Sequence, residues 1–546
     1  MAGRWMRPRR LAVIATFSAV SYAIASSSTH ESASASALEL SIIPAQGFVR
    51  SSRAIYTFAA NSFDYKYSLR GLDYRSDEYL RVRSKVHIRA AKRVLKLCEA
   101  NKGFYIKAGQ FVASLQHMPK EYISILSALQ DQASPCAFEV VEVVLEEEFG
   151  SDAMDMFQEF DKQPIAAASI AQVHRAWLKN NQVVAVKIQY PGLQQQFQID
   201  IATMSFLSHA VAWLFPDYQF QWIVPEFEKT SVKELDFDEE GRNAERTSKF
   251  FERHKYVKVP KIFWDKSSHR VLTMEFAHGC KIDDVKALQA AGIDPHKVAR
   301  VLVEIFAQMI FLHGSVHGDP HPGNILVHCQ NGQFQIVLLD HGLYRELEES
   351  FRIDFCHLWK ALVLGDTSEA QKVGERLGAG KFFKFLPVIF MGRAMESTSG
   401  FGEKMSAEER RKLRDEMRLL TFGDVSQFME ALPRDLLIVV RTDGLLRSII
   451  SKLGAQPWMR LLVNAKHAVS GLSHRNSYGT GAEKRNGVAV KKAQFEYLNL
   501  RLRLELLEMT YKMKDLYGSF LLLLGSLRKK FPQWLEALTL SRLSIF

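Results

Sequence analysis

Residues 317–324 read His-Gly-Asp-Pro-His-Pro-Gly-Asn, and a hydrophobic run further on ends in the tripeptide Asp-His-Gly at 340–342. An Asp, an Asn and a second Asp in this order supply the carboxylate and the oxygen ligands that metal-assisted phosphoryl transfer needs. In this interpretation Asp319 orients or deprotonates the attacking group, Asn324 binds magnesium, and Asp340 bridges magnesium to the phosphates. The stretch therefore predicts a kinase-like catalytic loop.

A metallohydrolase loop is the competing interpretation of the same residues. His317, Asp319 and His321 alternate as metal ligands on such a loop do. This interpretation leaves Asn324, Asp340 and an upstream strand lysine unexplained, so we favour phosphoryl transfer.

The segment that begins near residue 160 has the pattern of a kinase N-lobe. A loop of small residues, Ala166, Ala167, Ala168 and Ser169, precedes a predicted hairpin, and the strand 183–188 carries Lys187. Such a loop covers the phosphates of a nucleotide, and the lysine contacts the α and β phosphates. Alanine stands where glycine is usual. Because alanine restricts the backbone and adds methyl groups, nucleotide preference and phosphate geometry should differ from those of ordinary kinases.

Two acidic residues complete the predicted nucleotide site. Helices are predicted at 194–215 and from about 225 to 254, and Glu234 on the second is expected to form the ion pair with Lys187. The strand that ends near Glu275 runs into a glycine turn at Gly279, which suits a hinge between lobes, so Glu275 is expected beside the nucleotide.

A helical segment precedes the N-lobe, and the usual peptide-docking segment is missing. Residues 76–149 show helical apolar spacing with breaks near Pro119 and Pro135, and they contain Lys-Ala-Gly-Gln at 107–110. No Ala-Pro-Glu sequence follows Asp340. These features set the chain apart from ordinary protein kinases.

Taken together, the motifs resemble the UbiB/aarF-domain (ABC1-type) family of atypical kinases. The matching pieces are Lys107 to Gln110, the alanine loop, Lys187, Glu234-Leu235-Asp236, residues 317–324 and Asp340. His341 replaces the usual Phe. In this feature the chain most closely resembles the mitochondrial aarF-domain-containing kinase one branch of the family.

The resemblance implies properties that the residue spacing alone does not give. It implies that Lys107 and Gln110 face the carboxylates of Glu234 and Asp236 as regulatory residues, with the helical segment over the active site. It also implies ATP and Mg²⁺ as cofactors, and a membrane lipid or an isoprenoid quinone as partner. The implied location is mitochondrial and inner-membrane associated, with plastids as the alternative.

Composition is compatible with this setting. The 546-residue chain has a formal charge of +11, which suits an anionic partner, although we expect no nucleic acid. Its five cysteines never form a CxxC pair, which disfavours a disulfide framework or a zinc site. Four arginines and no acidic residue precede an apolar run at 11–25, which indicates a transit or anchor segment, with a secretory signal as the alternative.

We therefore expect an α+β, bilobal protein-kinase-like fold with an N-terminal helical extension and a helical C-terminal region. The expected parts are a transit or anchor segment (1–35), a linker (36–75), the helical extension (76–159), the N-lobe (160–278), the C-lobe with added helices (279–472), and a linker with amphipathic helices (473–546). The expected function is an atypical ATP- and Mg²⁺-dependent kinase or ATPase at a mitochondrial membrane, in lipid or quinone homeostasis. A nucleotide-binding scaffold without catalysis and a true Ser/Thr protein kinase are the alternatives.

Overall fold

The computed structural model describes residues 37–73, 76–114, 118–130, 135–216, 221, 223–330, 332–394, 397, 405–419, 432–478, 495, 497–518 and 520–521. The predicted transit or anchor segment at 1–35 lies outside these residues. Among the helices that are described, none is both long and apolar enough to cross a bilayer.

The chain divides into two compact units. The first comprises Met1–Val298, Val316–Glu346 and Arg414–Lys452, and the second comprises Ala299–Ser315, Leu347–Leu413 and Leu453–Phe546. The first unit holds both larger β-sheets and every residue of the predicted site. The predicted site therefore lies within that unit.

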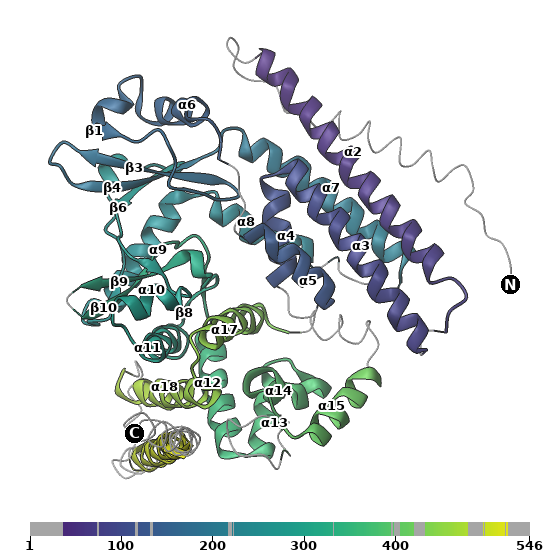
Figure 1. Cartoon of the computed structure of the whole chain (residues 1–546), viewed down its shortest axis with the longest axis vertical. Helices are drawn as coiled ribbons and strands as arrows, with labels where there is room; N and C mark the ends of the chain where they lie inside the picture. Colours follow the sequence, from purple (N-terminus) through teal and green to yellow (C-terminus); the bar gives the residue numbers. More distant parts are fainter. Residues whose placement is uncertain are drawn as a thin grey trace, which may run out of the picture. The chain divides into compact units, whose positions relative to one another are not determined.

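A five-stranded antiparallel sheet forms the predicted N-lobe. Its strands are β1 (Phe157–Phe160), β2 (Ala166–Ala167), β3 (Ala171–Leu178), β4 (Val183–Gln189) and β6 (Val271–Glu275), in the order β1-β3-β4-β6 with β2 on β3. The hairpin β3–β4 is confirmed, and Asn181 at its turn adopts a φ of 63°. Val144, Leu145 and neighbouring apolar residues of helix α6 (Phe138–Phe149) pack on this sheet (Figure 1). Burial of these apolar side chains stabilises the folded N-lobe through the hydrophobic effect.

A second sheet carries the catalytic loop. It contains β5 (Val257–Lys258), β10 (Gln333–Leu338), β9 (Ile325–Gln330) and β7 (Cys280–Lys281) in that order. The short helix η5 (Pro322–Asn324) leads directly into β9, and β10 ends just before Asp340. Because β9 and β10 are antiparallel neighbours, with Ile325 paired to Leu338, their ends bring Asn324 and Asp340 to one edge of the sheet.

The first unit also contains α-helices. They are α2 (Ala37–Ser68), α3 (Asp77–Asn101), α4 (Phe104–Ser114), α5 (Lys120–Leu126), α7 (Leu193–Leu214), α8 (Ile223–Glu234), α9 (Phe237–Phe250), α10 (Val285–Ala290) and α17 (Arg434–Lys452). Helices α2, α3 and α7 run side by side, with α4 and α5 next to α3 (Figure 1). Phe104 of α4, Phe197 of α7 and Phe237 of α9 belong to one core cluster with strand β6. The helical extension is therefore packed on the lobe whose site it adjoins.

The predicted linker at 36–75 is wrong over most of its length, because residues 37–68 form helix α2. Long-range polar contacts fix this helix. Arg50 is buried and donates from Nε to Oδ1 of Asp200 on α7 at 3.0 Å, and Ser51 lies 2.8 Å from the hydroxyl of Thr203. The partners lie about 150 residues away along the chain, so local sequence patterns could not reveal them.

The second unit is helical. Its elements include the later part of α11 (Pro295–Gln308), the π-helical turn Met309–His313, α12 (Glu349–Leu364), α13 (Thr367–Arg376), α14 (Leu386–Met391), most of α15 (Ala407–Leu419), and α18 (Pro457–Tyr478). Stacked and edge-on contacts join Phe311, Phe355, Trp359 and Phe390 in its core. Helix α18 extends through Tyr478, so the linker predicted from residue 473 begins inside a helix. A last helix spans residues 497–518, inside the segment where amphipathic C-terminal helices are expected.

Replacing Arg50 by Ala should lower the free energy of unfolding by about 3–5 kcal/mol, because the Asp200 carboxylate would remain buried without a cation. Urea denaturation followed by circular dichroism measures this loss, and hydrogen exchange of the α2 amides locates it. Arg53→Ala is the matched control, since Arg53 is exposed and bonds to the Ala100 carbonyl at the surface. It should cost about 1 kcal/mol or less. Equal losses in the two variants would show that the buried pair does not hold α2 in place.

Candidate active site

A cavity of about 600 Å³ in the first unit gathers the predicted site residues. Its volume is within the range of pockets that hold ligands the size of a nucleotide. The predicted residues that line it are Lys107, Gln110, Ala166, Ala167, Ala168, Ser169, Lys187, Glu234, Glu275, Asp319, Asn324 and Asp340. Asp236 is the one predicted site residue that is not part of this lining. The cavity is therefore the candidate active site.

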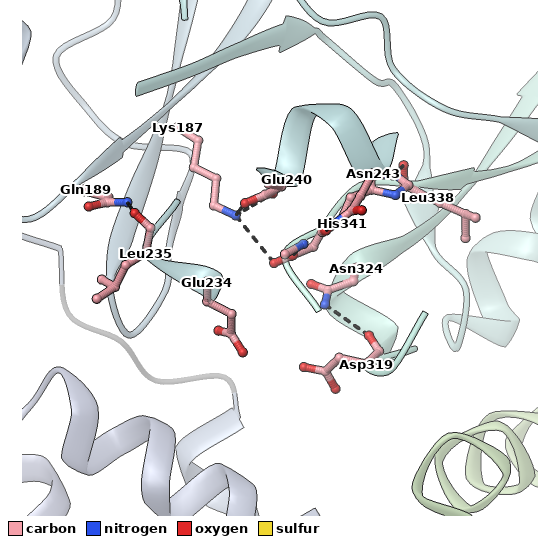
Figure 2. A network of polar contacts seen from close by, with 12 residues as sticks. Lys187, Gln189, Glu234, Leu235, Glu240, Asn243, Asp319, Asn324, Leu338 and His341 are labelled. Carbon is pink, nitrogen blue, oxygen red and sulfur yellow. Dashed lines mark hydrogen bonds and ion pairs between the residues drawn. The ribbon is translucent and has the colours of Figure 1, made fainter. Parts of the chain in front are cut away.

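Lys187 on β4 forms its ion pair with Glu240, which was not predicted. Its Nζ donates to Oε1 and Oε2 of Glu240 at 2.7 and 2.8 Å and lies 3.6 Å from Oδ2 of Asp340. The predicted pairing of Lys187 with Glu234 is wrong. Figure 2 shows the Glu234 carboxylate directed away from Lys187.

The error came from a helix break. The helix predicted from about 225 to 254 is two helices, since α8 ends at Glu234 and α9 begins at Phe237. Asp236 has extended φ and ψ angles of −110° and 98°, and its side chain accepts from the amide of Asp238. Buried Gln189 of β4 donates to the Leu235 carbonyl at 2.7 Å, which holds the break against the sheet (Figure 2).

The sequence carries a capping signal at this break. Asp236 is the N-cap of α9 and Glu239 occupies the third helical position, which is the spacing of a capping box. This signal places the end of the first helix before Asp236. The acidic residues in the first turn of α9, Asp238, Glu239 and Glu240, then become candidate partners for Lys187.

Glu234 instead contacts Lys107, at 2.5 Å between Oε2 and Nζ. Burial opposes the charge on Lys107, but the carboxylates of Glu234 and Asp319 raise its pKa above the ordinary value. The resemblance implied that Lys107 and Gln110 face the carboxylates of Glu234 and Asp236. Gln110 donates to the Leu129 carbonyl at 2.9 Å, and Asp236 caps α9. The contact across the cavity is therefore made by Lys107 and Glu234.

The catalytic loop presents oxygen ligands. The side-chain amide nitrogen of Asn324 donates to the backbone carbonyl of Asp319 at 3.3 Å, which leaves its side-chain oxygen as an acceptor. Burial disfavours the charged form of Asp340, yet the Lys187 ammonium and the Gly342 amide hold the pKa of Asp340 well below its usual range. An ionised carboxylate and an amide oxygen are the donors that Mg²⁺ prefers, with nucleotide phosphates completing its coordination. The residues present thus fit a magnesium-nucleotide site.

The histidines of the loop have structural partners. Nδ1 of His317 accepts from the Asp319 amide at 3.1 Å, and Nδ1 of His321 accepts from the Gly323 amide at 3.0 Å. In the described part of the chain, no group of three His, Cys, Asp or Glu side chains is placed to hold a metal by itself. The alternating histidines do not form a metallohydrolase site there.

Arg441 of α17 is a further cavity residue that the motifs did not indicate. Its Nη2 lies 3.5 Å from Oδ1 of Asp319, and its guanidinium lies 5.7 Å from the centre of the Phe111 ring. More than a hundred residues separate Arg441 from the catalytic loop, so only the fold brings them together.

The alanine loop adopts an ordinary backbone. Ala166 and Ala167 pair with β3, and the Ala168 amide donates to the Ala171 carbonyl at 2.7 Å, which closes the turn. Lys102 and Asn181 are the non-glycine residues with positive φ in the described chain, so this loop contains none. No residue of the loop therefore requires glycine for conformational reasons, and alanine methyl groups line the cavity instead.

A chain of hydrogen bonds connects α9 with the segment after Asp340. The Thr247 hydroxyl donates to the Tyr344 hydroxyl at 2.9 Å, Tyr344 lies 3.0 Å from Nδ1 of His341, and Nε2 of His341 lies 3.1 Å from the Leu338 carbonyl. Because a carbonyl can only accept, Nε2 carries the proton and Nδ1 accepts from Tyr344. Burial lowers the pKa of His341 to about 3, which fits this neutral ring.

These hydrogen bonds hold α9 through the side of the helix that carries Glu240. Asn243 on the same face donates to the His341 carbonyl at 3.2 Å. Glu240, Asn243 and Thr247 are spaced by three and four residues, so they share one side of the helix. A phenylalanine at position 341 could make neither of the ring hydrogen bonds.

The fold and the site define a protein-kinase-like protein, bilobal, with a helical N-terminal extension. Residues 128–374 match the model of the ABC1 atypical kinase-like domain. The chain is 41% identical over 415 residues to AarF domain-containing protein kinase 1 of Mus musculus, covering 75% of this chain and 79% of that one. It is 36% identical over 417 residues to AarF domain-containing kinase 1 of Drosophila melanogaster, covering 75% and 80%. The chain belongs to the ABC1/AarF family of atypical kinase-like proteins.

Thr247→Val should loosen α9, because the Tyr344 oxygen would lose its buried donor at a cost of about 1–3 kcal/mol. Hydrogen exchange of the α9 amides should then show protection reduced about fivefold or more. Thr57→Val is the control, since the Thr57 hydroxyl donates to the Arg53 carbonyl within its own helix. Unchanged α9 protection in Thr247→Val would refute the proposed role of this chain of bonds.

Proposed function

We propose that this chain binds a magnesium-nucleotide, with ATP as the first candidate, and catalyses attack on its terminal phosphate. The observation that carries the proposal is that these residues share one cavity. Lys187, paired with Glu240, lines it together with Asp319, Asn324 and Asp340. A binding scaffold would need groups that hold a nucleotide, but it would not need Asp319 at the position of the attacking group.

Each residue has a defined task in this proposal. The Lys187 ammonium, held by Glu240, neutralises charge on the α and β phosphates. Asn324 and Asp340 hold magnesium, which when bound polarises the phosphate oxygens. Asp319 orients the attacking hydroxyl or water and accepts its proton. The hinge backbone near Glu275 would border the base of the nucleotide. The alanine loop would cover its phosphates.

The acceptor is water or a small molecule in this proposal. Side chains of α4, α8 and α17, among them Phe111, Phe227 and Arg441, share the cavity with the catalytic groups. The Lys107–Glu234 contact lies in the same lining. A peptide segment would have to displace these groups, whereas water or a compact acceptor would not.

We further propose that the activity serves lipid or quinone homeostasis at a mitochondrial membrane. The basic, acid-poor N-terminal sequence supports import, since no acidic residue precedes Glu31. Imaging a tagged full-length chain and a chain lacking residues 1–30 tests the location. Loss of mitochondrial signal on truncation is expected, and an unchanged distribution would contradict the import proposal.

Purified full-length chain should hydrolyse or transfer the terminal phosphate of ATP only with Mg²⁺, and Asp340→Asn should reduce turnover at least about a hundredfold because magnesium loses its charged ligand. Turnover is measured with and without vesicles of anionic phospholipid, and with a chelator as the metal-free control.

Asp265→Asn is the matched variant, since Asp265 lies on the surface beside Lys266, away from the cavity lining. It should retain full turnover. If the unmodified chain binds ATP yet turns over no faster than Asp340→Asn under every lipid condition, the enzyme proposal fails and the scaffold alternative stands.

A further inference from the structure

The C-terminal helix 497–518 has two apolar faces, and the protein covers one of them. Leu504 and Tyr511 are buried in a cluster with Leu462, Ala465 and Val469 of α18. Tyr511 also stacks on Trp458, with ring centres 5.5 Å apart. Through this face the helix packs on the rest of the second unit.

The opposite face is a stripe of large apolar side chains in contact with solvent. Its members are Leu498, Leu502, Leu506, Met509, Met513 and Leu516, whose exposed fractions lie between 54% and 67%. They are spaced by three or four residues, so they form one continuous side of the helix. A contiguous exposed patch of this kind marks an interaction surface.

The acidic residues of this helix form ion pairs or hydrogen bonds with other parts of the second unit. Glu505 lies 2.7 Å from Lys466 of α18, and Glu508 lies 2.7 Å from Arg300 of α11. Asp515 accepts from the indole nitrogen of Trp458 at 3.1 Å. The charges of Glu505 and Glu508 are therefore balanced by cations of the same unit, and Asp515 is hydrogen-bonded.

Exposed basic residues border the stripe on both sides. At about 100° per residue, Arg501 and Lys512 lie along one edge and Arg503 and Lys514 along the other. Lys512 also pairs with Glu508 at 2.8 Å. An apolar stripe between two basic edges is the arrangement of helices that lie in the plane of a membrane surface, where long basic side chains reach the head groups.

We propose that this stripe binds the surface of a membrane that contains anionic phospholipid, with helix 497–518 lying along the interface. A second copy of the chain is a poorer partner, because two such stripes would bring basic edges against each other. The proposal names the surface of contact, which goes beyond the proposed membrane setting of the enzyme. It requires no nucleotide, so it can fail independently of the proposed activity.

Flotation of the full-length chain with vesicles tests the proposal. The chain should float with phosphatidylcholine vesicles that include an anionic phospholipid, and less with phosphatidylcholine alone. The double variant Leu502→Ser with Met509→Ser should weaken partitioning at least about tenfold, since it removes two inserted side chains. Leu364→Ser is the matched control, because Leu364 is an exposed leucine on α12 in the same unit.

A second variant tests the basic edges separately. Arg501→Gln with Arg503→Gln should lower binding to anionic vesicles about tenfold and leave the weak binding to neutral vesicles unchanged. Both residues are exposed, so neither change should disturb folding, which circular dichroism verifies.

Three outcomes would overturn the proposal. The first is unchanged flotation of the stripe variant. The second is a dimer in light scattering that the stripe variant abolishes, without vesicle binding, which would assign the face to a second copy. The third is vesicle binding only after residues 522–546 are removed, which would assign the face to that segment.

Discussion

The buried ion pair between Lys187 and Glu240 is the contact on which the site depends. Both side chains lie almost out of contact with solvent, so each charge is costly unless the other is close and well oriented. The pair forms only if α9 begins where it does. That start depends in turn on the Asp236 cap and on the bond from Gln189 to the Leu235 carbonyl. The position of one lysine on β4 is thereby linked to the break between two helices.

The other charges of the cavity are arranged around this pair. Glu234 contacts Lys107, and Asp319 faces Arg441, so the carboxylates of the site have cationic neighbours. The longest of these contacts are Lys187 to Asp340 at 3.6 Å and Arg441 to Asp319 at 3.5 Å. In the proposed function, the Asp340 carboxylate would bind magnesium and the Asp319 carboxylate would orient the attacking group. These two contacts are the ones that a nucleotide and its metal would most easily take over.

Short-range patterns in the sequence were sufficient for much of this arrangement. Short strand-like segments predicted the β3–β4 hairpin with Lys187, and the order and spacing of Asp319, Asn324 and Asp340 predicted a kinase-like catalytic loop. The partner of Lys187 was missed because a continuous helical pattern concealed the cap at Asp236. Helix α2, Arg441 and the bond from Thr247 to Tyr344 depend on contacts between distant segments. Neither periodicity nor local motifs report such contacts.

Double-mutant cycles on Lys187 test the central claim most directly. Lys187→Met is combined in turn with Glu240→Gln and with Glu234→Gln, and the free energy of unfolding is measured for each single and double variant by urea denaturation. Coupling of Lys187 to Glu240 should exceed its coupling to Glu234 by at least about 1 kcal/mol, because contacting residues are non-additive and separated ones nearly additive. Equal couplings, or a stronger coupling to Glu234, would contradict the site as described.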